Sequence, residues 1–553
     1  MPQDTFTIRL LAKELASSLR GGRINRINQP GKEELSLLIY TQKGTLKLTV
    51  NANAADCGVY FTTDNPLNPL TAPNFCMLLR KYLQGAEILG VETPGFERIL
   101  IFRVLCFSDF STAERELRVE IMGKYSNILL TEKGVILGAL KTTTIDENCR
   151  RAILPGAPYL PPAPQDKTDP SDLSALRALL IPPLPDDLAH FLFQHVAGLA
   201  PCTAEQIVSG YRGGDFARYV HDTVFSDEIS PCVVDKNGVP TDFFARYVPG
   251  GISFESISAA EQYFYAGRRA KKGFDELQRK LSSAVSSAKK KQEKRLSQVL
   301  EKRRQCEGME EDRIKGELLT ANLYRLKQGM RSCELENYYD EAGGTVKIVL
   351  DERLSPADNA QAYFKRYRKQ KRTLEVLGPQ ETEVRSELEY SLSLLAAIAS
   401  SDRMDDLKCL EEELQLAGLL KQPERRKKRQ AVPEYPFRRF EKDGFEVLAG
   451  RNNLQNDRLI RTSAPDDIWL HAQKYHSAHV VIRTGGRAVP DEVLLFAAGI
   501  CARYSDAKQG GRIPVDYCPI RQVKKPPKAR AGFVIYHEYK TILTEPDTDA
   551  KEL

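Results

Sequence analysis

The chain has 553 residues, of which 42% are hydrophobic and 28% charged, with a formal net charge of +6. This length exceeds what one hydrophobic core organises, so several domains are expected. No run of about 18 apolar residues occurs, which excludes a helical membrane span. Asp4 and Glu14 interrupt the apolar positions of the N-terminus, which is therefore not a signal peptide. The eleven cysteines include no C-x-x-C pair, so reduced thiols and a cytoplasmic location are expected.

The first predicted domain is an α+β unit over residues 1–170. Leucines recur at helical spacing over 5–25, which predicts an amphipathic helix. Short strands separated by Gly and Pro follow, then a helix over 74–85 and further strands up to about residue 150. The Pro-rich segment 154–165 is typical of an extended linker.

Residues 171–230 are predicted to form a helix-hairpin-helix domain. The segment HVAGLAPCTAEQIVSGY places a turn at Gly198 between two helices, and Thr203 is the expected cap of the second. Such a turn either aims backbone N–H groups at a phosphate or only packs the two helices, and the pattern does not decide between these. The strand-like residues 231–257 could return to the sheet of the first domain.

A long antiparallel coiled-coil arm is predicted over 258–432, with a small hairpin over 337–351. Between residues 266 and 305 there are fourteen Lys and Arg against four Asp and Glu. Most charged runs are solvated helix faces. Here the excess of positive charge, with Lys289, Lys290 and Lys291 consecutive, favours a contact with nucleic acid.

The last predicted domain, 433–553, is α+β and carries the segments DDIWLHAQKYHSAHVVIR (466–483) and DYCPIRQVKKPPKARAGFVIYHEYK (516–540). Cationic and aromatic groups on strands suit RNA, whereas Trp469 itself is expected in the core. A zinc site is disfavoured because the histidine spacing matches no helical ligand pair. The candidate RNA contacts here are His471, His479, Arg483, Lys524 and Lys525.

The first domain offers further candidate RNA contacts. Glu97 and Arg98 follow a turn at Gly95-Phe96, where an acid beside a guanidinium can bind a base edge or form only a local ion pair. A second turn combines backbone donors with a cation. The remaining candidates are Arg80, Lys81, Lys124, Ser126 and Asn127.

Enzymatic motifs are not found. The sequence has no G-x-S-x-G, no phosphate loop and no catalytic Cys signature, so no catalytic residue, metal or cofactor is expected. A base-excision glycosylase/lyase would use Pro2 as an amine nucleophile after removal of Met1. Gln3 occupies the place of the expected carboxylate and no four-Cys finger follows, which disfavours this alternative.

Segments along nearly the whole chain resemble the NFACT family, closest to its bacterial branch. In the first domain the resemblance rests on GGRINRINQPGKEELSL, NFCMLLRKYLQG, PGFERI and IMGKYSNILL. In the arm it rests on GELLTANLY and LSPADNAQAYFKRY. In the last domain it rests on NDRLIRTSAPDDIWLHA, HVVIR, PVDYCPIRQVKKP and AGFVIYHEYKT.

The resemblance implies a ribosome-associated quality control factor that does no bond chemistry itself. Its partners would be the large (50S) ribosomal subunit with its rRNA, a stalled peptidyl-tRNA, and charged tRNA, with tRNA-Ala expected for untemplated alanine tailing. A small RNA-binding helper protein is compatible with it, and a membrane is not expected. Glu97 and Arg98 match the family's Asp-Arg pair for tRNA, with the acid one methylene longer. The family's older name leaves a fibronectin-binding surface adhesin as the alternative.

Overall fold

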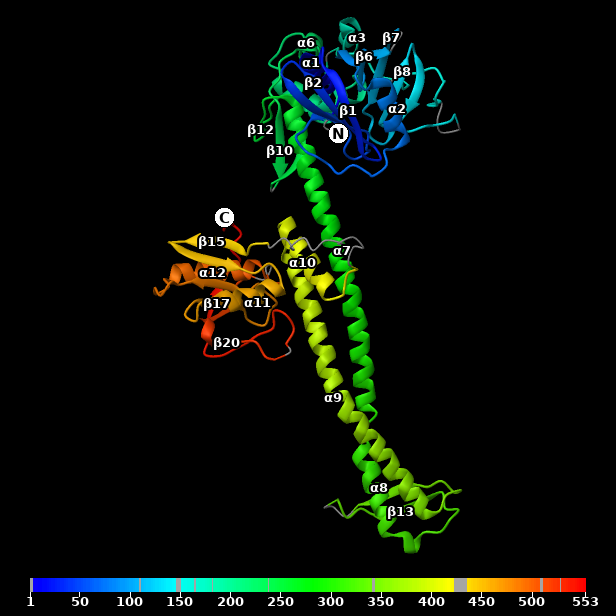
Figure 1. The fold of residues 1–553 in the computed structure, drawn as a ribbon, viewed down its shortest axis with the longest axis vertical. Coiled ribbons are helices and arrows are strands. Elements are labelled where there is room, and N and C mark those ends of the chain that lie inside the picture. Colours follow the sequence, from blue (N-terminus) through cyan, green and yellow to red (C-terminus); the bar gives the residue numbers. More distant parts are fainter. Residues whose placement is uncertain are drawn as a thin grey trace. The chain divides into compact units, whose positions relative to one another are not determined.

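The computed structural model describes residues 3–108, 111–145, 151–163, 166–181, 183–236, 238–340, 344–421, 435–507, 511–527 and 529–553. The chain divides into two compact units, Met1–Lys272 and Gly273–Leu553. Helices and strands mix in both units, so the protein is a multidomain α+β chain (Figure 1).

An antiparallel sheet with the order β4-β3-β2-β1-β5-β6-β7-β8-β9 dominates the first unit. Alternating or continuous apolar residues form these strands, as expected for a sheet that buries at least one face. The strands are β1 (Arg23–Gly31), β2 (Glu34–Thr41), β3 (Gly44–Asn51), β4 (Gly58–Phe61), β5 (Glu87–Glu92), β6 (Ile99–Ser108), β7 (Ser111–Glu120), β8 (Asn127–Glu132) and β9 (Val135–Ala139).

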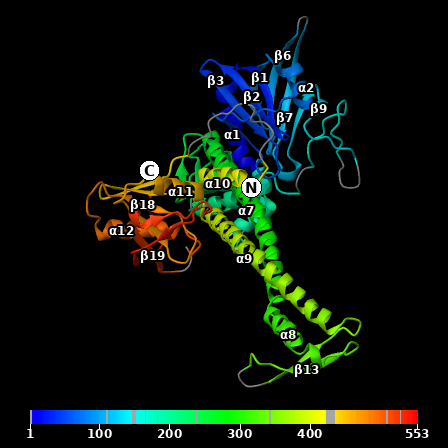
Figure 2. The same ribbon diagram turned by 60° about the horizontal axis from the view of Figure 1, so that its bottom comes forward.

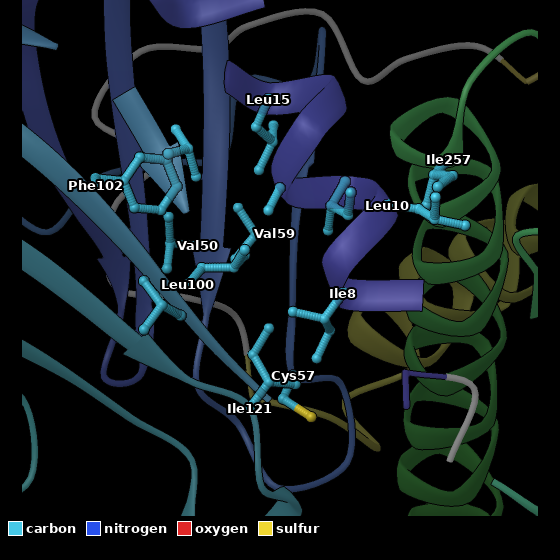
Figure 3. Close-up of a cluster of buried hydrophobic side chains, with 14 of the residues drawn as sticks. Ile8, Leu10, Leu15, Val50, Cys57, Val59, Leu100, Phe102, Ile121 and Ile257 are labelled. Carbon is cyan, nitrogen blue, oxygen red and sulfur yellow. The ribbon is translucent and has the colours of Figure 1, made fainter. Parts of the chain in front are cut away.

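Helix α1 (Thr5–Leu19) lays its apolar stripe on this sheet. Figure 3 shows Ile8 and Leu15 of α1 pointing toward Val59 and its neighbours on the sheet. The helix is shorter than the predicted 5–25, because Gly21 adopts φ +74° and β1 starts at Arg23. Left-handed backbone of this kind commonly ends helices.

In the described residues of the first unit, five further helices lie wholly within that unit. A 3-10 turn (Gly123–Tyr125) joins β7 to β8. Four of the five helices follow one another over 173–225 and pack into the same core as α1. The helices are α2 (Asn74–Leu83), α3 (Leu173–Leu179), α4 (Leu188–His195), α5 (Pro201–Gly210) and α6 (Phe216–Phe225).

Residues 231–257 do not join the large sheet. Strands β10 (Cys232–Lys236), β11 (Val239–Phe244) and β12 (Ile252–Ser253) hydrogen-bond among themselves in the order β11-β10-β12. Val233 and Phe243 of this small sheet pack beside Tyr60 of β4. The segment therefore returns to the first domain through side-chain packing and not through strand pairing, which corrects the expected continuation of the sheet.

Two long helices form the arm in the second unit: α7 (Ile257–Arg304), which begins in the first unit, and α9 (Pro356–Ser400). They run antiparallel, since Gln278 Nε2 donates to the Ile398 carbonyl and Arg303 pairs with Glu381. A buried cluster joins both to α10 (Met404–Leu416). Among the described residues, none of the helices has the length and apolar character to cross a bilayer.

The arm ends in a smaller cluster built from α8 (Met309–Ala321), a 3-10 turn (Leu323–Arg325) and the hairpin of β13 (Ser332–Glu336) and β14 (Thr345–Val349) (Figure 2). The hairpin begins five residues before the predicted 337–351. Residues 337–340 form a turn instead of a strand, because Asn337 Oδ1 accepts the Tyr339 N–H and its carbonyl accepts that of Asp340.

The C-terminal domain is built on an antiparallel sheet with the order β15-β16-β18-β17-β19-β22. One face packs on α12, and the other face carries Trp469 and is covered by α11 together with Ile520, Val523, Val534 and Tyr536. Its elements are β15 (Arg438–Lys442), β16 (Phe445–Ala449), α11 (Asn453–Thr462), β17 (Ile468–Ala472), β18 (Val480–Arg483), α12 (Asp491–Arg503), β19 (Ile513–Pro519), a 3-10 turn (Ile520–Gln522), β20 (Val523–Lys524), β21 (Ile535–Tyr536) and β22 (Lys540–Thr544).

Candidate nucleic-acid interface

Two turns of the first unit meet at one end of the large sheet. Ile99 at the start of β6 pairs with Glu120 at the end of β7. The next residues stay together, since the Ile121 N–H donates to the Arg98 carbonyl at 2.9 Å. The Glu97-Arg98 turn therefore lies beside the Gly123–Tyr125 turn, whose Lys124 and Tyr125 are exposed with the ammonium 4.8 Å from the ring centre.

The Glu97-Arg98 turn is fixed by its neighbour Phe96. The Phe96 side chain is buried, lies 5.8 Å from the Phe225 ring centre and fills the space above Gly198. This anchor leaves Glu97 and Arg98 half-buried at the surface. A rigid support of this kind reduces the entropy lost when a ligand is bound.

Burial raises the pKa of the Glu97 carboxyl, and the adjacent Arg98 guanidinium opposes this rise. Lys167 lies near the same turn, and burial together with the Arg98 charge lowers the pKa of its ammonium. The Lys167 ammonium donates to the Phe193 carbonyl at 2.7 Å. A carboxylate acceptor thus stands beside a guanidinium donor within a cationic edge, a set that can bind a base edge and a phosphate together.

The other predicted contacts of the first domain differ in exposure. Arg80 donates from Nε to the Ile27 carbonyl at 2.7 Å and ties α2 to β1, whereas Lys81 is exposed against Tyr82. Ser126 and Asn127 are buried. Ser126 Oγ accepts the Met122 N–H and the Asn127 amide binds the backbone of residue 141, so both side chains serve the fold. Neither side chain is therefore left on the surface to contact RNA.

The helix-hairpin-helix turn holds an internal carboxylate. Asp4 Oδ2 accepts the Ala200 N–H at 3.1 Å and the Thr203 hydroxyl at 2.5 Å. Thr203 is therefore not the cap of α5, since its hydroxyl donates to Asp4 and Ala200 is the N-cap residue. The carboxylate occupies the position that a phosphate would take at this helix start. The turn acts as a packing device against α1.

The arm carries its cations in two places. Lys290 and Lys291 are exposed on α7, while Lys289 lies 3.5 Å from Glu293. A second group, which we call the basic groove, lies where α9 begins and α7 ends. It encloses about 660 Å³ and is lined mainly by Lys302, Lys365, Arg368, Lys369 and Arg372.

Sequence analysis missed the α9 half of the basic groove. The signal was present as FKRYRKQKR over 364–372. The four α9 cations are exposed, and no ion pair joins any of the groove's five cations to a carboxylate of a described residue. Unpaired cations gathered at one place are the electrostatic requirement for a phosphate backbone.

In the C-terminal domain most predicted contacts are engaged in the fold. Arg483 pairs with buried Asp467 at 2.8 Å, and Lys525 pairs with Asp457. His479 is buried and His471 is half-buried on the face that carries Trp469. Lys524 is exposed on β20. The hairpin of β20 and β21 places Lys524 and Lys525 near Tyr536, which packs on Trp469 beside the two histidines, so these residues form one basic, aromatic region.

The two histidines stand opposite each other on β17 and at the start of β18, with ring centres 5.4 Å apart. Burial lowers the pKa of His471 to about 4 and that of His479 well below its usual value. Both rings are therefore neutral near pH 7. No cluster of three or more His, Cys, Asp or Glu suited to a metal occurs in the described part of the chain.

Residues 4–432 match the sequence profile of the NFACT N-terminal and middle domains, and residues 435–537 match that of the NFACT protein RNA-binding domain. The chain belongs to the NFACT family. The two NFACT profiles together cover both units, and the boundary between them falls within residues 422–434, which lie outside the described part. The basic, aromatic region of the last domain thus lies within the RNA-binding module.

The NFACT chain is similar along nearly its whole length to proteins named Rqc2 homolog RqcH. It is 33% identical to that of Bacillus subtilis, over 98% of this chain and 97% of the relative. It is 32% identical to that of Streptococcus suis, over 99% of both. An archaeal Rqc2 homolog from Methanocaldococcus jannaschii is 28% identical over 28% of this chain and 22% of the relative.

A solved structure, the N-terminal part of the fibronectin/fibrinogen-binding protein of Streptococcus suis, is 29% identical with a TM-score of 0.44, over 48% of this chain and 98% of that one. The C-terminal part of the same protein is 27% identical with a TM-score of 0.39, over 50% and 96%. Both TM-scores lie below 0.5, so these two structures carry no argument about function.

Proposed function

We propose that this protein is a ribosome-associated quality control factor that binds RNA and has no reactive centre of its own. The observation that carries the proposal is the similarity to RqcH proteins over both units, with an RNA-binding domain at residues 435–537. In this proposal the protein binds a large (50S) subunit that still holds peptidyl-tRNA, and recruits charged tRNA, with tRNA-Ala as the expected species. Peptide bonds form in the ribosome, and the tail is alanine.

The geometry supports separate surfaces for tRNA and for ribosomal RNA. The edge with Glu97, Arg98 and Lys124 offers a rigid acceptor–donor pair beside a cation, which suits discrimination of a tRNA loop whose bases are unstacked. The basic groove and the exposed lysines of α7 offer charge without sequence readout, which suits ribosomal RNA. Such a factor acts by holding reactants in position. The cytoplasm, where ribosomes work, is its proposed location.

The decisive test is alanine tailing in a reconstituted reaction with purified 50S–peptidyl-tRNA complexes and charged tRNA. Arg98→Ala is expected to abolish tails while the thermal unfolding temperature stays unchanged. Arg103→Ala is the matched control, because Arg103 lies on β6, the strand that directly follows Arg98, is half-buried as Arg98 is, and pairs with Glu114 at 2.7 Å. Undiminished tails from Arg98→Ala would remove the site assignment.

A second measurement tests the binding partner. The protein is expected to sediment with 50S subunits and to enrich tRNA and 23S-type rRNA after crosslinking in cells. A protein found only outside the cell, bound to fibronectin and without crosslinked RNA, would contradict the proposal and favour the adhesin alternative.

A further inference from the structure

A cavity of about 550 Å³ lies inside the second unit, between the C-terminal domain and helix α9. Its walls come from α9, from the strand face that carries Trp469, from the start of α11, and from residues 526–527 and 529–536, which we call the cover segment. The volume falls within the range of roughly 300–1,000 Å³ that is typical of small-ligand sites.

Aromatic rings form one wall of the cavity. His471 stacks on Trp469 with ring centres 5.6 Å apart and planes 3° apart. Tyr536 of the cover segment lies 4.8 Å from the indole, measured between ring centres. His479 meets the indole edge-on at 5.3 Å. Flat rings can stack on one another at such spacings, so the wall suits a planar ligand.

Two polar atoms of this wall have no hydrogen-bond partner among the described residues. They are Trp469 Nε1 and His479 Nδ1. Both side chains are nearly fully buried, with exposed fractions of 0% and 1%, and both line the cavity. A buried donor or acceptor without a partner is costly, and native folds rarely contain one. A ligand with its own donors and acceptors would satisfy them.

The cavity is also lined by Arg438 and Arg451, whose guanidiniums are both paired with Asp406, and by Glu389. Burial keeps His471 and His479 uncharged near pH 7, because it lowers the pKa of both rings. On the cover segment and just before it, Arg530 lies 3.2 Å from Glu387, and Lys524 is exposed. A ligand with a neutral aromatic head and an anionic tail matches this arrangement.

The cover segment is anchored at Gly532 and at its C-terminal end. The Gly532 N–H donates to Asp457 Oδ1 at 3.0 Å, and Gly532 lies so close to Asn453 that a Cβ would meet the amide oxygen at 2.3 Å. Val523 and Lys524 pair with Tyr536 and Ile535. The segment is thus a loop closed by a short hairpin, with the cavity beneath it.

We propose that this cavity takes one unstacked nucleobase of an RNA strand, with Trp469 Nε1 and His479 Nδ1 hydrogen-bonding the base edge and the backbone phosphate lying along Lys524, Lys525 and Arg530. This rests on the proposed RNA-binding function and names the part of the RNA that the last domain holds. A purely apolar ligand would leave both nitrogens unpaired. A bare anion would find neutral histidine rings inside, and two guanidiniums that carboxylates already neutralise. A nucleobase in an RNA strand has hydrogen-bonding groups on a neutral ring and carries its phosphate outside that ring.

The fluorescence of Trp469 reports on the cavity directly, because Trp469 is the only tryptophan in the chain. The full chain is titrated with a short single-stranded RNA, with the same RNA carrying one abasic position, and with each nucleoside 5′-monophosphate. RNA binding is followed independently by the anisotropy of a 3′-labelled strand. We expect the intact RNA to quench Trp469 fluorescence in parallel with anisotropy, and the monophosphates to do so only at much higher concentration.

The variant His479→Phe keeps the ring and removes the nitrogen. It is expected to raise the unfolding temperature of the free protein, because an unpaired buried polar group is removed, and to weaken RNA binding about tenfold, which corresponds to ~1.4 kcal/mol. His537→Phe makes the same change at an exposed position of the same domain that does not line the cavity, and is expected to alter neither.

The outcomes are distinguishable. RNA binding by anisotropy without a change in Trp469 fluorescence, and unaffected by His479→Phe, overturns the cavity proposal and leaves the proposed function intact. Absence of RNA binding at any salt concentration overturns the proposed function as well. A free monophosphate could quench Trp469 as strongly as RNA does at the same concentration. That result would mean that the cavity binds a free nucleotide, and it would overturn the assignment to RNA.

Discussion

Glu261 is a buried carboxyl that lies on α7 within the first unit and accepts a hydrogen bond from the Gln3 amide. Burial raises its pKa well above the usual value. The unfolded chain therefore releases this proton above about pH 4.5 while the folded chain retains it. The free energy of unfolding must fall as the pH rises from there to the folded pKa.

Glu261→Gln is expected to remove this loss while keeping the shape of the side chain. The difference in unfolding free energy, variant minus parent, should grow from near pH 4.5 upward and exceed ~1 kcal/mol at pH 9, since one pKa unit corresponds to ~1.4 kcal/mol. Urea unfolding at a series of pH values measures it. Glu276→Gln, at an exposed position on the same helix, is the matched control.

A second buried carboxylate, Asp406, has a lowered pKa, in contrast to the raised pKa of Glu261. Burial raises the pKa of Asp406, but the Arg438 and Arg451 guanidiniums outweigh this and hold it below its usual value. Asp406→Asn leaves Arg438 buried without its anion and leaves Arg451 paired with Glu552 alone, and a loss of roughly 3–5 kcal/mol in unfolding free energy is expected. Thermal denaturation should show the C-terminal domain loosening, because Asp406 lies on α10 while both arginines lie on the domain. A melting temperature equal to that of the parent would contradict this role.

At the level of elements, the turn between α4 and α5 controls the Glu97-Arg98 edge. Gly198 has φ +73°, and an added Cβ would come within 2.5 Å of the Phe96 ring. Gly198→Ala therefore combines left-handed strain of roughly 1–3 kcal/mol with a displaced anchor. We expect reduced tailing and a lower melting temperature together. Gly213→Ala, at another left-handed glycine with open space around it, should lower stability but spare tailing.

Local sequence patterns predicted which helices and strands form. Contacts between residues far apart in the sequence determined where those elements end and which side chains come together. The leucine spacing gave α1, yet its end depended on Gly21 and on the pairing of β1. Thr203 has the chemistry of a cap, but its hydroxyl binds Asp4, which lies 199 residues earlier. The basic groove joins Lys302 to cations more than sixty residues later, and only the antiparallel arm brings them together. Contacts of this separation leave no periodic signal in the sequence.

The candidate site divides in the same way. Glu97 and Arg98 could be predicted because the turn at Gly95-Phe96 directly precedes them in the sequence. The structure leaves both half-buried at the surface. Ser126 and Asn127 look identical in sequence to exposed turn residues, yet the pairing of β8 buries them. The cavity beside Trp469 combines residues from α9, β17 and the cover segment, which no single stretch of sequence reveals.

For the whole molecule, affinity for the ribosomal subunit is expected to depend steeply on salt, because cations without carboxylate partners release counterions from RNA. Lys365→Ala with Lys369→Ala should remove two phosphate contacts from the basic groove. The slope of log affinity against log salt should then become shallower by about 1.5, at ~0.7–0.9 per contact. Sedimentation with 50S subunits between low and physiological salt measures both slopes.

The matched control for this change removes two lysines that already have carboxylate partners. Lys280 lies 2.7 Å from Glu411 and Lys315 lies 3.0 Å from Glu311, so their charges are compensated within the protein. Lys280→Ala with Lys315→Ala lowers the net charge by the same amount and should leave the slope unchanged. If both double variants shift the slope equally, total charge and not the basic groove governs binding, and the assignment of the groove to RNA is wrong.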